Sequence, residues 1–262
     1  MSSKETDGLL TFDGHLEVFR HVLFRILGVT LVIAAVVFCL KDTTWRLLLA
    51  PSEWDFVTYR WIEGVAHALG LADFHFEEYH VDLIATDLSS QFMTHITTAV
   101  YLGLLGASPY ILYELFRFVS PALYENERRY GVQVALTIYL LFIVGVLMSY
   151  YVLFPVSFRF LGTYSVADRV HSSITLDSYV STFTSLTLIM GLVFQLPVVA
   201  FFLTKIGLIN SRMLARFRRH AFIVIMLVAA IITPPDVMTL ILVSIPLYLL
   251  YEVSIRVSRW CA

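Results

Sequence analysis

Long runs of apolar residues that contain no Asp, Glu, Lys or Arg dominate the chain. Six such windows follow one another, at 26–40, 92–113, 130–158, 178–204, 221–235 and 237–251. A helix needs about 20 mainly apolar residues to cross the hydrocarbon layer of a bilayer. The first window reaches that length if Arg25 lies at the interface, with its charge among the headgroups. The pattern predicts an all-α integral membrane protein with six transmembrane helices.

Interfacial flanks extend the predicted spans to about 22–40, 92–116, 130–155, 178–204, 219–235 and 237–256, within a single polytopic domain over 1–262. The fifth and sixth windows differ from the others, because 15 residues at about 1.5 Å each reach only about 22 Å of a core about 30 Å thick. Pro234 and Pro235 separate these windows and cannot continue a helix, whereas Asp236 can cap the next one. We therefore expect a short helical hairpin that thins the bilayer locally.

The segment 41–91 between the first two spans is too long to be a bare loop, and it carries nine acidic residues. Apolar residues recur there at helical spacing: Trp54, Val57, Trp61, Val65, Ala68 and Leu69. This spacing predicts an amphipathic helix over 53–69 that caps the outer face of the bundle. We expect it to pack against the protein's own spans, with binding to the membrane surface as the alternative.

Composition and charge support the same class of protein. Hydrophobic residues make up 58% of the chain and charged residues 15%, whereas soluble domains carry about 25% charged residues. The net charge of -2 gives no support for a nucleic-acid partner. With both termini in the cytoplasm, thirteen Lys and Arg residues face inward and five face outward, as the positive-inside rule requires. No removable signal peptide is expected.

Catalytic and metal-binding patterns are missing from the sequence. It contains no HExxH, GxSxG or GxxxxGK[ST] motif and no pair of carboxylates within the spans, so we expect no enzymatic activity. The two cysteines and His95 have no ligands at metal-binding spacing, and no cofactor is expected. A secondary transporter for a small solute is the alternative, but it needs polar groups near the membrane midplane, where Gln195 alone qualifies.

One segment is far more specific than the hydrophobic pattern. Residues 108–129 read SPYILYELFRFVSPALYENERR, which resembles the TatC family of twin-arginine protein translocases. Further matches follow in family order, from about His15 to Glu252: Ala50-Pro51, Ile84-Ala85-Thr86-Asp87, Phe194-Gln195-Leu196-Pro197, Thr233-Pro234-Pro235-Asp236 and Ile245-Pro246-Leu247. The resemblance thus covers almost the whole chain.

The resemblance implies a receptor and core subunit of the twin-arginine export translocase in the bacterial inner membrane. Such a subunit binds twin-arginine signal peptides of folded cargo at its cytoplasmic face and assembles as an oligomer with small single-span partner subunits. The resemblance assigns arginine binding to Glu127, with Phe118 and Pro121 shaping the loop. A carboxylate pairs better with the planar guanidinium fork of arginine than with the ammonium group of lysine. The alternative is an exposed ion pair between Glu127 and Arg128 or Arg129.

The start of the first span departs from the family pattern, which is similar to His-Leu-x-Glu-Leu-Arg. Here His15-Leu16-Glu17-Val18-Phe19-Arg20 places Val18 at the family's Glu position. Glu17 is rotated from that position by about 100° on a helix, so it substitutes only if the helix turns or its side chain reaches across. Its alternative role is charge balance at the helix start. Arg20 matches the pattern, and it also suits an arginine at the membrane interface.

Three further positions match the family. Gln195 stands where the resemblance implies a polar residue used in signal-peptide insertion or partner contact, with a helix–helix hydrogen bond as the alternative. Pro51 and Asp236 are interpreted as a turn residue and a helix N-cap. Leu240 replaces the Gln that the family often has four residues after Asp236.

Overall fold

The structure is a computed structural model that describes residues 12–70, 75–76, 78–79, 81–119, 131–165, 167, 173–233 and 236–261. Its elements are α1 (Phe12–Cys39), α2 (Lys41–Leu49), a 3-10 turn (Ala50–Ser52), α3 (Val57–Ala68), β1 (Leu83–Ile84), α4 (Ser90–Val119), α6 (Gly131–Met148), a π-helical segment (Ser149–Leu153), α7 (Phe154–Thr163), β2 (Ile174–Thr175), α8 (Leu176–Val193), α9 (Leu196–Lys205), α10 (Ser211–Arg216), α11 (Arg218–Ile232) and α12 (Val237–Cys261).

The chain divides into two compact units. Unit 1 contains 1–39 and 99–139, and unit 2 contains 40–98 and 140–262. Helices α4 and α6 each have residues in both units, so the chain passes from one unit to the other within a helix. The single domain over 1–262 stays a prediction.

Membrane-spanning helices account for most of the described residues. Five stretches are long and apolar enough to cross a bilayer: Glu17–Cys39, Ser90–Phe118, Val134–Thr163, Leu176–Lys205 and Val237–Trp260. They correspond to predicted spans one to four and six. The fifth predicted span is present as α11, whose 15 residues reach about 22 Å.

The sixth helix is longer than the sequence window indicated. α12 has 25 residues and continues past 251 through Glu252, Arg256 and Arg259. These charges end an apolar window, but Glu and Arg are good helix formers and do not end a helix. The prediction of a short hairpin therefore holds for α11 and underestimates α12.

Two spans depart from regular α-helix beside a proline. The third span contains the π-helical segment Ser149–Leu153 just before Pro155. Proline lacks the N–H that would continue the regular helical bonding, and a π-bulge accommodates one extra residue. The fourth span is interrupted between α8 and α9 at Phe194 and Gln195, and Pro197 is the second residue of α9, where its missing N–H has no cost.

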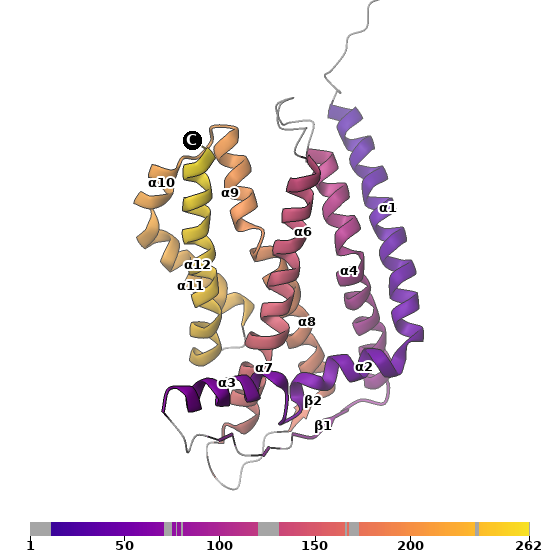
Figure 1. Ribbon diagram of the computed structural model, residues 1–262. Helices are drawn as coiled ribbons and strands as arrows, with labels where there is room; N and C mark the ends of the chain where they lie inside the picture. The colour runs from indigo at the N-terminus through magenta and orange to yellow at the C-terminus, as the bar shows by residue number, and fades with distance from the viewer. Residues whose placement is uncertain are drawn as a thin grey trace, which may run out of the picture. The chain divides into compact units, whose positions relative to one another are not determined.

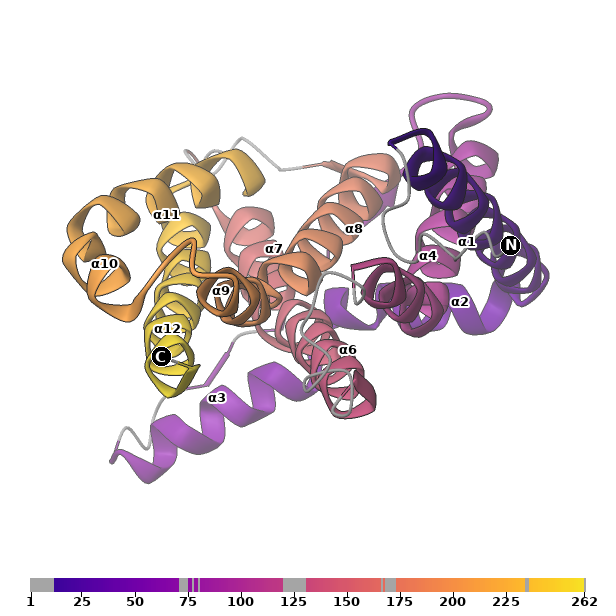
Figure 2. The ribbon, with the colours of Figure 1, turned by 90° about the horizontal axis from the view of Figure 1, so that it is seen from above.

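In unit 1, α1 and α4 run antiparallel and side by side (Figures 1 and 2). They approach closely where Gly103 faces Ala34, because a Cβ atom on Gly103 would lie 2.7 Å from the Ala34 Cβ atom. The absence of a side chain at this position therefore sets the distance between the helices.

Unit 2 contains a large apolar core to which several helices contribute. Its buried members include Leu153, Phe154, Phe158, Tyr179, Val180, Phe183, Leu186, Met190, Ile225, Ala229, Val243, Leu247 and Leu250. α6 approaches α8 closely at Gly145, where a Cβ atom would lie 2.6 Å from the Met190 carbonyl oxygen. The hydroxyls of Ser149 and Thr187, 3.1 Å apart, hydrogen-bond beside this contact.

The segment between the first two spans forms a cap of short elements. α2 and the parallel pair β1–β2, with Leu83 opposite Ile174, were not predicted from the sequence. The Tyr179 hydroxyl donates to the Leu48 carbonyl at 2.8 Å and so joins α2 to α8. α3 lies crosswise to α12 and along one edge of unit 2 (Figures 1 and 2).

α3 confirms a helix within 53–69, but its apolar stripe faces outward. Val57 is 52% exposed, Trp61 77%, Val65 57% and Leu69 76%, and the residues that pack inward are Thr58, Tyr59 and Ala66. The expected packing of this stripe against the protein's own spans is therefore wrong. On the inward side, the Tyr59 hydroxyl forms hydrogen bonds within the protein. The spacing of apolar residues alone does not predict such a contact.

Candidate functional site

The best-defined part of the expected site lies in unit 1, where α1 begins and α4 ends. The rings of Phe19 and Phe118 meet there, with centroids 5.6 Å apart and planes tilted by 56°. This contact places the first turns of α1 beside the last turn of α4, which leads into residues 120–130. Glu127 and Pro121 lie outside the described residues. The described contact thus joins the start of α1, which carries Glu17 and Arg20, to Phe118 at the end of α4.

Glu17 and Arg20 are both exposed on α1. A 2.8 Å hydrogen bond joins the backbone oxygen of Glu17 to Nδ1 of His21. This bond does not involve the Glu17 carboxylate. Phe19 is two positions after Glu17 along the helix, which places their side chains about 160° apart around its axis. Glu17 therefore points away from the side of α1 that contacts Phe118.

A buried carboxylate lies one helical turn before Phe118. Glu114 has a side chain only 5% exposed, and its Oε1 accepts a hydrogen bond from the Tyr110 hydroxyl at 3.1 Å. The guanidinium of Arg25, which is 53% exposed, lies 3.4 Å from the same oxygen. A buried carboxylate needs such partners, since leaving it unpaired costs several kcal/mol.

Glu114 was not predicted from the sequence as a functional residue, although it lies within the segment that resembles the family. Arg25 was expected to reach the headgroups, and half of its side chain is exposed while it pairs with Glu114. A signal was present in the sequence: one acid near the end of the second apolar window and one arginine at the start of the first. Their pairing depends on the antiparallel packing of α1 and α4.

Comparison with known proteins identifies the family. A model of the family "Sec-independent protein translocase protein (TatC)" matches residues 14–246. This chain belongs to the TatC family. It is a multi-pass membrane protein of the twin-arginine translocation family, a protein translocase family and not an enzyme family. The resemblance seen in the sequence is confirmed, and the secondary-transporter alternative is set aside.

Relatives cover most of the chain. The TatC protein of Blattabacterium is 34% identical over 218 residues, which are 81% of this chain and 80% of that protein. The TatC protein of Desulforapulum autotrophicum is 32% identical over 251 residues, 95% of this chain and 84% of that protein. A crystal structure described as the twin-arginine translocase receptor TatC has a TM-score of 0.74 and 29% identity, and covers 94% of this chain and 99% of that one.

Gln195 lies in unit 2 at the break between α8 and α9. Its side-chain Nε2 donates to the Gly191 carbonyl oxygen at 3.4 Å, one turn back along the same helix. The side chain is partly exposed, so the interrupted span presents an amide at this position. The bond to Gly191 lies within the fourth span.

Pro51 and Asp236 have local structural partners. Pro51 is buried within the 3-10 turn Ala50–Ser52. The Oδ1 atom of Asp236 accepts a hydrogen bond from the Thr239 N–H at 2.6 Å, which is the geometry of an N-cap on α12. His95 lies against Trp45, with ring centroids 6.2 Å apart. Among the residues that the structure describes, no group of three or more His, Cys, Asp or Glu side chains is arranged to hold a metal ion.

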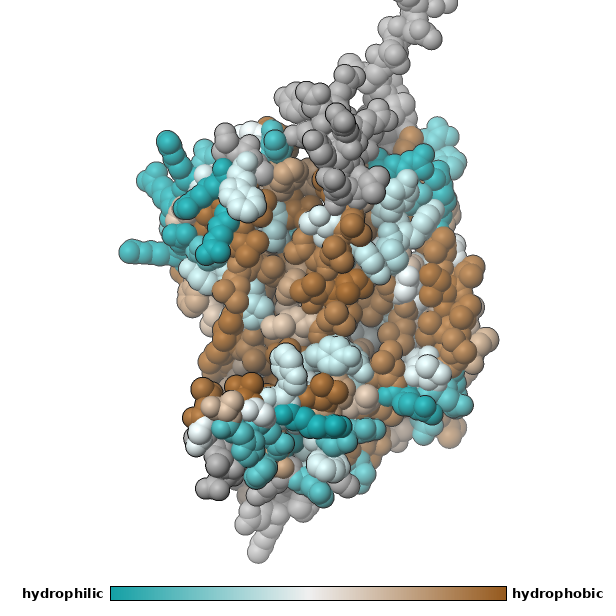
Figure 3. Space-filling model, viewed as in Figure 1, coloured by the Kyte–Doolittle hydropathy of each residue, from teal (hydrophilic) through white to brown (hydrophobic). Residues whose placement is uncertain are grey.

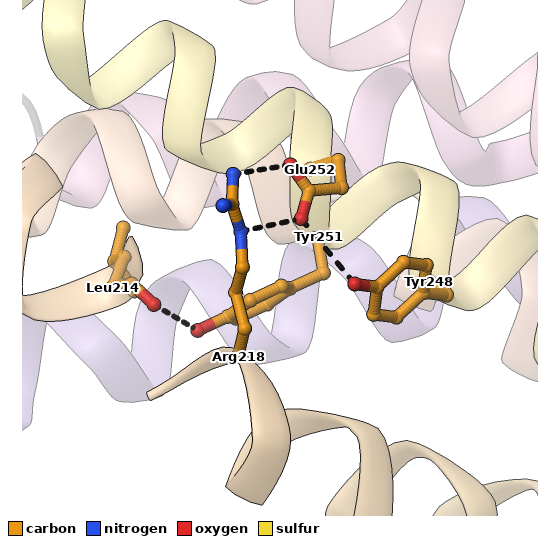
Figure 4. A network of polar contacts seen from close by, with 5 residues as sticks. All are labelled: Leu214, Arg218, Tyr248, Tyr251 and Glu252. Atoms are coloured by element: carbon orange, nitrogen blue, oxygen red, sulfur yellow. Dashed lines mark hydrogen bonds and ion pairs between the residues drawn. The ribbon is translucent and has the colours of Figure 1, made fainter. Parts of the chain in front are cut away.

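A bidentate ion pair ties the start of α11 to α12 (Figure 4). The Arg218 Nε atom lies 2.7 Å from Oε1 of Glu252, and an Nη atom donates to Oε2 at 2.8 Å. Tyr248 donates to the same carboxylate at 3.5 Å, and the Tyr251 hydroxyl donates to the Leu214 carbonyl of α10 at 2.8 Å. This network was not expected from the sequence, because it joins residues of separate helices.

Proposed function

We propose that this chain is the receptor and core subunit of a twin-arginine translocase in a bacterial inner membrane, with both termini in the cytoplasm. It binds the paired arginines of signal peptides on folded cargo and assembles as an oligomer with small single-span partner subunits. The contact between Phe19 and Phe118 is the observation that supports this proposal, because it joins one expected site residue, Phe118, to the start of α1. The similarity to a solved twin-arginine translocase receptor supports the same function.

Glu127 is proposed as the main ligand for the arginine pair, with Phe118 and Pro121 shaping the loop that carries it. An arginine offers parallel N–H donors to a carboxylate, whereas a lysine offers a single compact charge. A carboxylate on a shaped loop therefore favours twin-arginine over twin-lysine peptides. Glu17 is a weak second ligand in this proposal, because it points away from Phe118, and Arg20 positions the start of α1 at the interface.

Gln195 is proposed as a contact for a partner subunit or for an inserting signal peptide. Its amide is partly exposed at the break in the fourth span, and lipid hydrocarbon offers an exposed amide no hydrogen-bonding group. A single-span helix that carries a hydrogen-bonding side chain at the matching depth would form a polar contact with this exposed amide.

The experiment measures binding of a twin-arginine signal peptide and its twin-lysine variant to the purified protein in nanodiscs. We expect the wild type to prefer the twin-arginine peptide by at least about tenfold, a difference of about 1.4 kcal/mol. Glu127→Ala should abolish the preference, whereas Glu17→Ala should retain most of it. Thermal unfolding of each variant shows that it is folded. Equal binding of both peptides by the wild type would contradict the proposal.

A further inference from the structure

The apolar stripe on α3, defined as Val57, Trp61, Val65 and Leu69, is exposed although it lies on a membrane protein's outer cap. Its members are four residues apart, so successive side chains differ by only about 40° around the helix. The residues that face the protein, Thr58, Tyr59 and Ala66, lie on another side. A four-residue apolar stripe that includes a tryptophan requires an apolar neighbour.

Contacts on the inward side prevent α3 from rotating to bury this stripe. The buried Tyr59 hydroxyl donates to the Pro155 carbonyl at 2.8 Å and lies 3.1 Å from the Tyr79 hydroxyl. The Arg159 guanidinium lies over the Phe76, Tyr79 and Tyr59 rings, at 4.3, 4.5 and 5.0 Å from their centroids. Burial, followed by the hydrogen bond to Tyr79, raises the pKa of the Tyr59 phenol, so it stays a neutral donor.

A third side of α3 is polar. Arg60 and His67 are exposed there, and Arg60 Nη2 pairs with Asp55 at 3.2 Å. Helical geometry places Arg60 about 100° from Trp61 and His67 about 120° from Trp61 around the axis. α3 therefore has three sides, of which one packs on protein, one is polar and one is apolar and exposed. This division is typical of a helix that lies in a membrane interface.

The start of α3 packs against the exposed end of a span in the same unit. Val144, Leu147 and Tyr151 are exposed along the third span, and the Tyr151 ring stacks on Phe56, the residue before α3, at 5.9 Å. Thr58 donates a hydrogen bond to the Tyr151 carbonyl oxygen. Figure 3 shows hydrophobic surface on the side of α3 toward the spanning helices and hydrophilic surface on its far side.

We propose that α3 is an interfacial helix whose apolar stripe inserts into the headgroup–acyl boundary of the bilayer and anchors the outer cap to phospholipid. Trp61 suits this boundary because its apolar ring enters the acyl layer while its indole N–H meets the polar layer. Insertion to about 5–10 Å is typical of such helices. This lipid contact is separate from signal-peptide recognition, so either proposal can fail without the other.

Spin labels measure the environment of each side of α3. Both cysteines of the chain are replaced by serine, and single cysteines are introduced as Trp61→Cys, Val65→Cys, Arg60→Cys and His67→Cys. In phosphatidylcholine–phosphatidylglycerol nanodiscs, labels at 61 and 65 should collide several-fold more with oxygen than with a water-soluble nickel chelate. Labels at 60 and 67 should show the reverse preference. Equal exposure to nickel at all four positions, or shielding of 61 and 65 from both reagents by protein, would overturn the proposal.

A second measurement avoids introduced cysteines. Fluorescence of the wild type minus that of Trp61→Phe isolates the Trp61 signal from the chain's other three tryptophans. Lipids brominated on their acyl chains should quench this difference signal strongly, and a water-soluble quencher should affect it little. Thermal unfolding shows that Trp61→Phe is folded. A difference signal that is unchanged by brominated lipids excludes insertion of the stripe.

Discussion

Glu114 gains its pairing with Arg25 only when α1 and α4 pack together. Its Oε1 accepts from Tyr110, and Arg25 lies 3.4 Å away. We predict that Glu114→Ala lowers the free energy of unfolding by about 1–3 kcal/mol, because the Tyr110 hydroxyl loses its acceptor. Glu114→Gln should cost less, since an amide oxygen still accepts that bond. Thermal unfolding in detergent measures both, with Glu17→Ala as an exposed control. A loss as large for Glu17→Ala would contradict this account.

The two arginines at the start of α11 offer a matched pair of variants. Arg218 makes two short contacts with Glu252, whereas its neighbour Arg219 is exposed. Lysine can form only one such contact with the carboxylate, so Arg218→Lys should lower stability by about 0.5–1 kcal/mol. Arg219→Lys should leave it unchanged. Denaturant titration of the two variants compares them directly, and equal midpoints would show that the bidentate geometry contributes nothing.

At single positions, local roles were easier to predict than partnerships. Asp236 was expected to cap the next helix from its place after two prolines, and it accepts a bond from the Thr239 N–H. The pairing of Arg25 with Glu114 joins residues 89 positions apart and depends on how both helices are rotated. The spacing of residues in the sequence does not show how the two helices are rotated about their axes. Glu127 and Pro121 lie outside the described residues, so their roles stay predictions.

Among the helices, the close approach of α6 and α8 requires glycine at 145. A Cβ atom there would lie 2.6 Å from the Met190 carbonyl oxygen, which is backbone and cannot rotate away. Gly145→Ala should therefore separate the helices, stretch the 3.1 Å hydrogen bond of Ser149 with Thr187, and destabilise the protein by about 1–3 kcal/mol.

Gly28 is the control for this prediction, because nothing lies within 4 Å of a Cβ atom placed on it. Gly28→Ala should be neutral or stabilise α1 by up to about 1 kcal/mol, since alanine favours helix. Unfolding of the two variants in the same detergent separates steric effects from helix propensity. If both lose the same stability, the approach at Gly145 is not the cause.

Helices with a strong hydrophobic pattern could be predicted from the sequence. Strands that form only by hydrogen bonding to a partner strand could not. Five spans and α3 follow from apolar runs and helical spacing. The two-residue strands β1 and β2 have no signal of their own, because each is defined by its partner. The outward direction of the α3 stripe could not be predicted either, since spacing identifies an apolar side without its neighbour.

For the whole molecule, the proposed tasks are divided between the units. The expected peptide-binding segments lie in unit 1, whereas Gln195, α3 and the short α11 lie in unit 2. A variant confined to unit 2 should therefore impair passage of cargo without impairing binding of the signal peptide. That separation makes it feasible to test local bilayer thinning apart from recognition.

The short helix α11 provides the test of thinning. Its 15 residues reach about 22 Å, against a hydrocarbon core about 30 Å thick, so lipid beside it must thin or its ends must be wetted. Inserting Leu-Ala-Leu-Ala after Ile232 adds about 6 Å of helix, while inserting Gly-Ser-Gly-Ser at the same place lengthens only the turn. If thinning lowers the barrier to passage, the helical insertion should reduce export of a twin-arginine reporter several-fold more than the flexible one. Signal-peptide binding should be equal in both. Normal export by a stably inserted, lengthened α11 would show that thinning is not required.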